Sequence, residues 1–358
     1  MNVTFLIGNG FDRNLGLDTM YSDFIKVYKE SDANTQTLKN FRSFITDNEE
    51  LWSSAELAFG KYTGEFGGGE GEWFSECQDD FCQNLALYLK EQELRIDYLT
   101  NKDAIFKAFS HLNNITSSFP AQERAVLDGV YNNYISEGII FNFICYNYTR
   151  TLDECLAVLK EKNSTIGTHK HGSQTLNHTI GQICHVHGTV EKDMVFGVND
   201  ESQILNVKLF DCDDGDLYKS LLIKRQANAS YLENTDGKAN QILTNSKIIY
   251  VYGMSIGDTD NLWWDRICTW LAADNTRHLI LQKYEMPPKG VFPRRYQRFE
   301  REQRRQFMEH SQLAEEKKKI IENRIHITGE NIFQSIHNIA NPSVRRVPEG
   351  TEQIAVEV

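Results

Sequence analysis

Two glycine-rich turns, each following a short apolar stretch, have residue types that can bind a phosphate group. The first, Gly8-Asn9-Gly10, follows the apolar run Val3–Ile7. Glycines after a buried strand let backbone N–H groups approach an anion, and a following helix N-terminus favours its negative charge. The sequence departs from the dinucleotide-binding fingerprint at Arg13, where a third glycine would stand. A plain tight turn explains the same letters, so both interpretations stay open.

Two aspartates lie close to this first turn. Asp12 and Asp23 offer carboxylate oxygens that could hold a ribose hydroxyl or simply cap a helix. The candidate ligand-binding residues of this region are Gly8, Asn9, Gly10, Phe11, Asp12 and Asp23.

The second turn spans residues 253–257 and follows the apolar stretch 247–252. Its candidate ligand-binding residues are Gly253, Ser255 and Asp258, while Asp260 suits the N-cap of a following helix. The same letters also fit the Gly-x-Ser-x-Gly elbow of a hydrolase. That alternative needs a later histidine and a partner acid, and His278 and His326 are available as the histidine.

Asn147 and His187 are the candidate catalytic residues. Asn147 follows the strongest apolar run, 138–146, and its amide can orient a ribose or a water, or cap the next helix as Thr149 can. His187 stands in the string His185-Val186-His187-Gly188, where strand alternation would place both imidazoles on one face. Such a pair can be purely structural, or one imidazole can act as a general base, for which His187 beside a flexible glycine is the better candidate.

Five histidines gather between residues 169 and 187, and this density also permits a metal site. Imidazoles together with an aspartate would suit zinc or another transition metal. No His-Glu-x-x-His string or cysteine pair fixes a coordination geometry, so the sequence predicts no metal. The histidines are His169, His171, His178, His185 and His187.

The elements that must position these residues alternate between strands and helices. Near-continuous apolar strands separated by amphipathic helices indicate an α/β fold with a mostly parallel sheet. Strands are predicted at residues 3–7, 138–146, 183–190, 194–198, 247–252, 278–284 and 324–328. Helices are predicted at 21–30, 35–60, 73–135, 151–162, 260–273, 293–324 and 331–339. We therefore expect one α/β domain over residues 1–340, with helical insertions at about 35–135 and 290–324 and a loosely held tail at 341–358.

Composition narrows the class of protein. The 358 residues carry a net charge of -12 and are 40% hydrophobic, which is enough for a core and disfavours coating nucleic acid with the whole surface. The longest apolar run, 138–146, falls far short of the roughly 20 residues that span a bilayer. Seven scattered cysteines without a Cys-x-x-Cys pair favour the cytoplasm.

Residues 293–324 depart from the acidic average. They contain ten basic and six acidic side chains. Such a stretch is either a solvated helix face with ion pairs or a docking surface for an acidic partner or nucleic acid.

Four strings in this order resemble the AbiH family of bacteriophage abortive infection proteins. They are IGNGFDRNLGLDTMYSDF at 7–24, YNYTRTLDE at 146–154, HVHGTV…FGVND at 185–200 and YVYGMSIGDTDN at 250–261. The pattern is in turn distantly similar to the sirtuin fold, in the spacing of Gly8, Gly10 and Gly16, in Asn147 and in His187-Gly188. The four-cysteine zinc module of sirtuin deacetylases has no counterpart in this sequence.

The resemblance implies a three-layer, sirtuin-like or Rossmann-like domain that hydrolyses NAD during anti-phage defence. In that role the two glycine turns would hold the dinucleotide phosphates, Asn147 would orient the ribose or water, and His187 would accept a proton. An NAD+ glycohydrolase must be controlled, which implies a homo-oligomer or a defence partner protein. The alternatives are a nucleotide-binding sensor or scaffold without turnover, and a metal-dependent hydrolase or nuclease built on the histidines.

Overall fold

A seven-stranded sheet runs through the centre of the protein. The computed structural model describes residues 1–160, 165–230, 234–257, 260–288, 290 and 292–342. The strands lie in the order β3-β4-β2-β1-β5-β6-β7, and all are parallel except β3, which is antiparallel to β4. Their bounds are β1 (Asn2–Ile7), β2 (Ile139–Cys145), β3 (Thr165–His171), β4 (Gln174–His185), β5 (Ile248–Tyr252), β6 (His278–Gln282) and β7 (Ile325–Thr328). The predicted α/β class with a mostly parallel sheet is confirmed.

The central strand β1 shows why the sequences of the inner strands are nearly continuous apolar runs. Val3, Phe5 and Ile7 belong to one buried core, whereas Leu6 belongs to a second core on the opposite face. A strand covered on both faces has no polar side to alternate with. The chain builds outward from β1 through β2 to β4, and then returns to the other side of β1 with β5.

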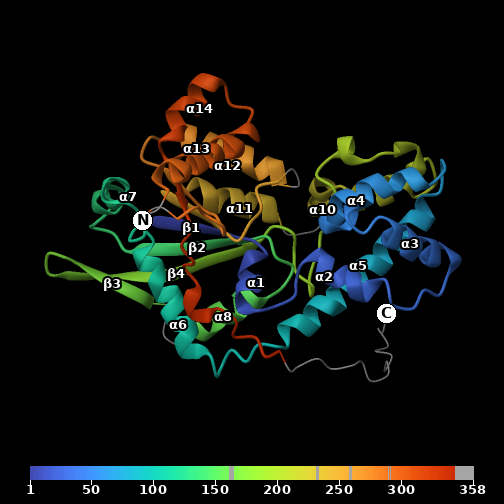
Figure 1. Cartoon of the computed structure of the whole chain (residues 1–358), viewed down its shortest axis with the longest axis horizontal. Coiled ribbons are helices and arrows are strands. Elements are labelled where there is room, and N and C mark those ends of the chain that lie inside the picture. The colour runs from blue at the N-terminus through green and yellow to red at the C-terminus, as the bar shows by residue number, and fades with distance from the viewer. Residues whose placement is uncertain (161–164, 231–233, 258–259, 289, 291, 343–358) are drawn as a thin grey trace.

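Helices cover both faces of the sheet (Figure 1). One face packs against four helices, namely α1 (Gly10–Leu15), α6 (Lys102–Ser110), α7 (Ala121–Asn133) and α8 (Thr151–Lys160). The other packs against α11 (Thr235–Thr244), α12 (Asn261–Ala273), α13 (Pro293–Glu309) and α14 (Glu315–Glu322). The predicted basic stretch 293–324 is thus two helices, which lie above α12 in Figure 1.

A separate group of helices, which we call the helical lobe, has its own core beside the sheet (Figure 1). It comprises α2 (Tyr21–Tyr28), α3 (Gln36–Asp47), α4 (Ala55–Tyr62), α5 (Gly71–Glu93), α9 (Gly215–Leu222) and α10 (Lys224–Ser230). Fully buried aromatic rings fill this core, among them Phe41, Trp52, Phe59 and Phe81. The predicted helical insertion 35–135 therefore divides between two places, because α6 and α7 pack on the sheet instead.

Three sequence predictions about elements are wrong. The strand predicted at 183–190 belongs to the longer β4, which ends at His185, and the segment 194–198 forms only an isolated bridge from Val198 to Ile223. The helix predicted at 331–339 is a single 3-10 turn, Gln334–Ile336. Asn338 has a φ of 56° and its N–H donates to the Asn14 carbonyl, so the chain leaves the helical path there.

Among the described residues, no helix is long and apolar enough to cross a membrane. Residues 343–358, most of the tail predicted to be loosely held, lie outside the described residues.

Candidate functional site

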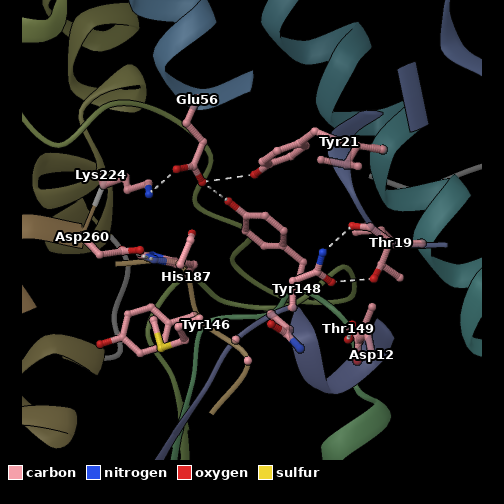
Figure 2. Close-up of a pocket in the computed structure, with 18 residues that line it drawn as sticks. Asp12, Thr19, Tyr21, Glu56, Tyr146, Tyr148, Thr149, His187, Lys224 and Asp260 are labelled. Carbon is pink, nitrogen blue, oxygen red and sulfur yellow. Dashed lines mark hydrogen bonds and ion pairs between the residues drawn. The ribbon is translucent and has the colours of Figure 1, made fainter. Parts of the chain in front are cut away.

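A pocket opens at the carboxyl edge of the central strands, between the sheet and the helical lobe (Figure 2). Four neighbouring parallel strands deliver residues to it. Gly8 and Asn9 follow β1, residues 146–149 follow β2, His187 follows β4, and residues 253–255 follow β5. The carboxyl ends of parallel strands meet at one edge of a sheet, which is why motifs spread over 250 residues come together.

The structure gathers most of the sequence-predicted site residues around this pocket, but not all. Gly8, Asn9, Asp12, Asn147, His187, Gly253 and Ser255 line it. Gly10 and Phe11 do not, because Gly10 packs against Gly253 and the Phe11 ring is buried against Phe333 with centroids 5.1 Å apart. Asp23 is also absent, since its carboxylate pairs with Arg13 at 2.9 Å and accepts the Met20 N–H at the start of α2. Asp258 lies outside the described residues.

The two glycine turns pack tightly against each other. The Gly10 N–H donates to the Gly253 carbonyl at 2.8 Å, and the Gly8 N–H donates to the Tyr252 carbonyl at 3.0 Å. A Cβ added at Gly10 would lie 2.4 Å from Gly253 Cα, and Gly253 itself has a φ of 65°. The close approach of the two turns is thus one physical reason for glycine at both positions.

Asn9 and Asp12 use their polar atoms to tie turns together. Asn9 exchanges two hydrogen bonds with Thr19, one from its amide to the Thr19 carbonyl at 3.0 Å and one accepted from the Thr19 hydroxyl. The buried Asp12 carboxylate accepts hydrogen bonds from the hydroxyls of Thr149 and Thr151 at the start of α8. Burial raises the pKa of Asp12 to about 6, although these hydroxyls act in the opposite direction.

His187 lines the pocket beside Asp260 and the rings of Tyr146 and Tyr148 (Figure 2). Its Nε2 lies 3.5 Å from Asp260 Oδ1, and the ring packs edge-on against Tyr146 at 5.6 Å. Burial acts to raise the pKa of Asp260, but the hydrogen bond to His187 and the nearby Lys224 ammonium lower it below its usual value. Asp260 therefore carries a negative charge that orients His187 through Nε2.

His185 and His187 do not share a face, contrary to the sequence prediction. His185 is the last residue of β4, and its Nε2 lies 2.8 Å from Asp153 on α8, outside the pocket. The chain then turns at Gly188, whose φ is 67°. Strand alternation ends with the strand, so the second imidazole points into the pocket while the first does not.

Three buried polar atoms on residues that line this pocket have no hydrogen-bond partner among the described residues. They are Nδ1 of His187, Nδ2 of Asn147 and the hydroxyl of Tyr146. Buried polar groups are nearly always hydrogen-bonded, because each unpaired one costs about 1–3 kcal/mol. An imidazole nitrogen and an amide donor are thus available to a polar ligand at this edge of the sheet, whereas the Tyr146 hydroxyl points away from the pocket (Figure 2).

A buried ion pair forms the wall of the pocket on the side of the helical lobe. Lys224 Nζ lies 2.6 Å from Glu56 Oε2, and both side chains are about nine-tenths buried. The other Glu56 oxygen lies 3.0 Å from the Tyr148 hydroxyl and 3.2 Å from the Tyr21 hydroxyl (Figure 2). Burial opposes the charge of Lys224, but Glu56 and Asp260 raise its pKa above its usual value, so it stays an ammonium.

Sequence reasoning missed this network. Glu56 falls on the apolar stripe formed by Trp52, Ala55 and Phe59, and a charged residue at a buried helical position is a signal that it has a partner. Lys224 carries no such signal. It lies 168 residues from Glu56 along the chain, so no local sequence pattern links the two residues.

The histidines do not form a metal site among the described residues. No group of three or more His, Cys, Asp or Glu side chains there is placed to hold an ion. His169 contacts His178 at 2.7 Å on the β3–β4 hairpin, while His185 and His187 turn to different surroundings. The cluster seen in the sequence is therefore dispersed in space.

The hydrolase elbow is also not assembled. His278 begins β6 level with Ile248 at the start of β5, whereas Ser255 follows the end of β5. His278 and His326 lie 3.0 Å apart and His326 contacts Glu123. The serine and the two histidines thus lie at opposite ends of the sheet.

A comparison with protein families places a match over residues 4–282, to the family described as bacteriophage abortive infection AbiH. That range contains all four sequence motifs and every described residue that lines the pocket. A search of curated proteins found no match to the chain.

Proposed function

The chain belongs to the AbiH family of bacteriophage abortive infection proteins, and we propose that it acts by hydrolysing NAD to nicotinamide and ADP-ribose when activated. The family gives the abortive-infection role. The reaction is inferred from the pocket, where an unpaired imidazole nitrogen and an unpaired amide lie together at the carboxyl edge of the sheet.

The strand order supports a dinucleotide as the ligand. If the six parallel strands alone are numbered along the chain, their order across the sheet is 3-2-1-4-5-6. Successive strands are added on one side of β1 up to β4, and then on its other side from β5 onward. Sheets of this order bind dinucleotides in the crevice at the point of reversal. The pocket lies there, with the turn at Ser255 exposed beside it.

The proposed reaction replaces one bond at the anomeric carbon of the nicotinamide ribose. The water oxygen forms a bond to C1′ while the bond from C1′ to the pyridinium nitrogen breaks. The electron pair of the broken bond stays on the nitrogen, so nicotinamide leaves as a neutral molecule. His187 Nδ1 accepts the proton from water or from a ribose hydroxyl, with Asp260 stabilising the resulting imidazolium. Asn147 Nδ2 donates to the attacking water or the ribose. Because the leaving group is already cationic, orientation supplies most of the rate enhancement.

The test measures NAD in cells and in purified protein. Phage-infected cells that carry the protein should lose NAD and gain ADP-ribose, and protein purified from them should release nicotinamide from added NAD. His187→Ala and Asn147→Ala should each lower turnover about 100-fold or more, since each removes a group that acts on the reacting atoms. His171→Ala, an exposed histidine on β3, is the matched control and should leave turnover unchanged.

Two results would reject the proposal. One is protection against phage with unchanged NAD; the other is full turnover in both pocket variants. Retained NAD binding without any turnover, measured by calorimetry, would assign the pocket to a nucleotide sensor instead.

A further inference from the structure

A second hollow lies along α13, away from the pocket described above. The loop that follows β6 forms one side of it with Met286 and Pro288, and α13 forms the other side with arginines. The groove has a volume of about 860 Å³. It belongs to the basic stretch that the proposed NAD chemistry does not use.

The charge of α13 is concentrated on its exposed side. The helix carries six arginines and three glutamates in a protein whose net charge is -12. Arg295, Arg298 and Arg301 line the groove and are exposed, and none has an ion-pair or hydrogen-bond partner among the described residues. Cations left without a carboxylate in an acidic protein form a local attraction for an anion.

Two further arginines of the helix, Arg304 and Arg305, are engaged. Arg305 forms a bidentate contact with Glu302 at 2.8 and 2.9 Å, which also neutralises one of the groove's acids. Arg304 donates to the Ile325 carbonyl at 2.7 Å and so fastens the helix to β7. The free arginines of the groove therefore lie between the N-terminus of the helix and its midpoint at Arg301.

The second half of α13 is anchored in the core, so the arginines stand on a rigid support. Phe307 and Met308 are buried, and Phe307 packs against Trp264 of α12 with ring centroids 5.9 Å apart. Arg295, Arg298 and Arg301 are each three residues apart, which places them on one side of the helix over about 9 Å. That length matches a row of successive backbone phosphates better than a single anion.

Two aromatic side chains stand exposed next to the groove. Tyr284 is 90% exposed and directly precedes the groove residue Glu285, while Phe292 is 50% exposed and directly precedes α13. Exposed rings beside unpaired arginines are what proteins use to stack bases while holding phosphates. An acidic polypeptide would use the charges but has no need of the rings.

We propose that the α13 groove binds single-stranded nucleic acid, with Arg295, Arg298 and Arg301 on phosphates and Tyr284 stacked on a base. The face of a ring can stack only on bases that are not already stacked in a duplex, which favours the single strand. The proposal rests on charge, shape and exposure at α13, and it holds or fails separately from the NAD reaction.

Binding is tested with the full chain and a fluorescein-labelled 20-nucleotide strand, by anisotropy at 50 to 300 mM salt. Three phosphate contacts predict a slope near -2 for log affinity against log salt concentration, because each contact on a single strand contributes about -0.7. Arg298→Ala with Arg301→Ala should bring the slope to about -0.7. Tyr284→Ala should weaken binding about tenfold at every salt concentration, and the labelled duplex should bind more weakly than the single strand.

The matched control removes the same charge from the neighbouring helix. Lys317→Ala with Lys319→Ala takes two exposed lysines from α14, outside the groove, and should leave the slope unchanged. An equal loss of affinity in the two double variants would show that only the net charge of the protein matters, and it would overturn the proposal. Absence of binding at 50 mM salt would overturn it as well. Tighter binding of a poly-glutamate peptide would assign the groove to an acidic protein partner instead.

Discussion

Asp12 shows how a residue predicted to bind a ligand can hold the site together instead. Its two carboxylate oxygens are occupied by Thr149 and Thr151, so it joins the turn after β1 to the start of α8. This contact fixes the backbone that carries Asn147, two residues beyond the end of β2. The role of Asp12 as a cofactor ligand stays a prediction, whereas its role in joining two turns is visible in the structure.

The buried Asp12 should make stability depend on pH. The native pKa of about 6 lies above the usual 3.8, so the folded state binds the proton more tightly than the unfolded state. Asp12 therefore stabilises the fold fully below pH 4, and this contribution is lost as the pH rises through 6. The shift corresponds to on the order of 3 kcal/mol. Asp12→Asn keeps the shape without the charge and should not show this loss.

Urea unfolding of both proteins at pH 4 and pH 7.5 measures this effect. The free energy of unfolding of the native protein, minus that of Asp12→Asn, should fall by about 2.4 kcal/mol between the two pH values, because the unfolded-state carboxyl is already partly ionised at pH 4. Glu93, whose pKa burial raises to about 7 with a smaller contribution from the Asp12 charge, titrates in both proteins, and only the part due to Asp12 remains in the difference. If this difference in the free energy of unfolding does not change with pH, the ionised Asp12 carboxylate does not destabilise the folded state.

At the scale of elements, the sequence predicts the central strands well and the edge poorly. The stretches 139–145 and 248–252 are apolar except at Asn142 because both faces of the sheet are covered, and each is a strand of the structure. The edge strand β3 reads Thr-Ile-Gly-Thr-His-Lys-His and is mostly exposed, so it lacks the apolar signal. The turn 331–339 has helical spacing in Ile332, Phe333 and Ile336, but contacts to Asn14 bend it out of a helix.

The contact between the two glycine turns should be sensitive to a single methyl group. In Gly10→Ala the new Cβ would meet the Gly253 backbone at 2.4 Å, and neither turn can move without disturbing β1 or β5. We expect a loss of about 2 kcal/mol or more in the free energy of unfolding. Chemical unfolding followed by circular dichroism measures it.

The control for this prediction is a glycine with open space around it. Gly129 lies within α7, and a Cβ there would meet nothing within 4 Å. Gly129→Ala should raise stability by up to about 1 kcal/mol, because alanine loses less backbone entropy in a helix. Similar effects of the two substitutions would mean that the turns can separate, and the packing argument would fail.

At the scale of the whole molecule, the pocket is composite. The sheet supplies Asn147, His187 and the glycine turns, all of which follow strands and could be found by locating strand ends. The helical lobe supplies Glu56 and Lys224, whose pairing depends on how α4 and the segment that leads into α10, with Leu222 and Ile223, pack in one core. Local sequence patterns show where strands end, but they do not show which distant segments pack together. The sequence therefore predicted the wall of the site that the sheet forms and missed the wall that the helical lobe forms.

The Glu56–Lys224 pair should couple the pocket wall to the stability of the whole protein. Lys224→Met leaves a carboxylate buried without its cation, which typically costs 3–5 kcal/mol. Glu56→Gln should cost less, because the Asp260 carboxylate still attracts the Lys224 ammonium. The double variant removes both charges and should be more stable than the sum of the single losses predicts, by about 2 kcal/mol.

A double-mutant cycle by urea unfolding at pH 7.5 measures this coupling. Ser202→Ala with Lys208→Met, two exposed changes near the lobe, is the control and should give additive effects within about 0.5 kcal/mol. Additive losses at Glu56 and Lys224 would show that water reaches the pair and screens it, and the pocket wall would then be open on that side. A large coupling energy requires both charges to be buried away from water. The Glu56 and Lys224 side chains are buried in this way where the helical lobe packs beside the carboxyl edge of the sheet.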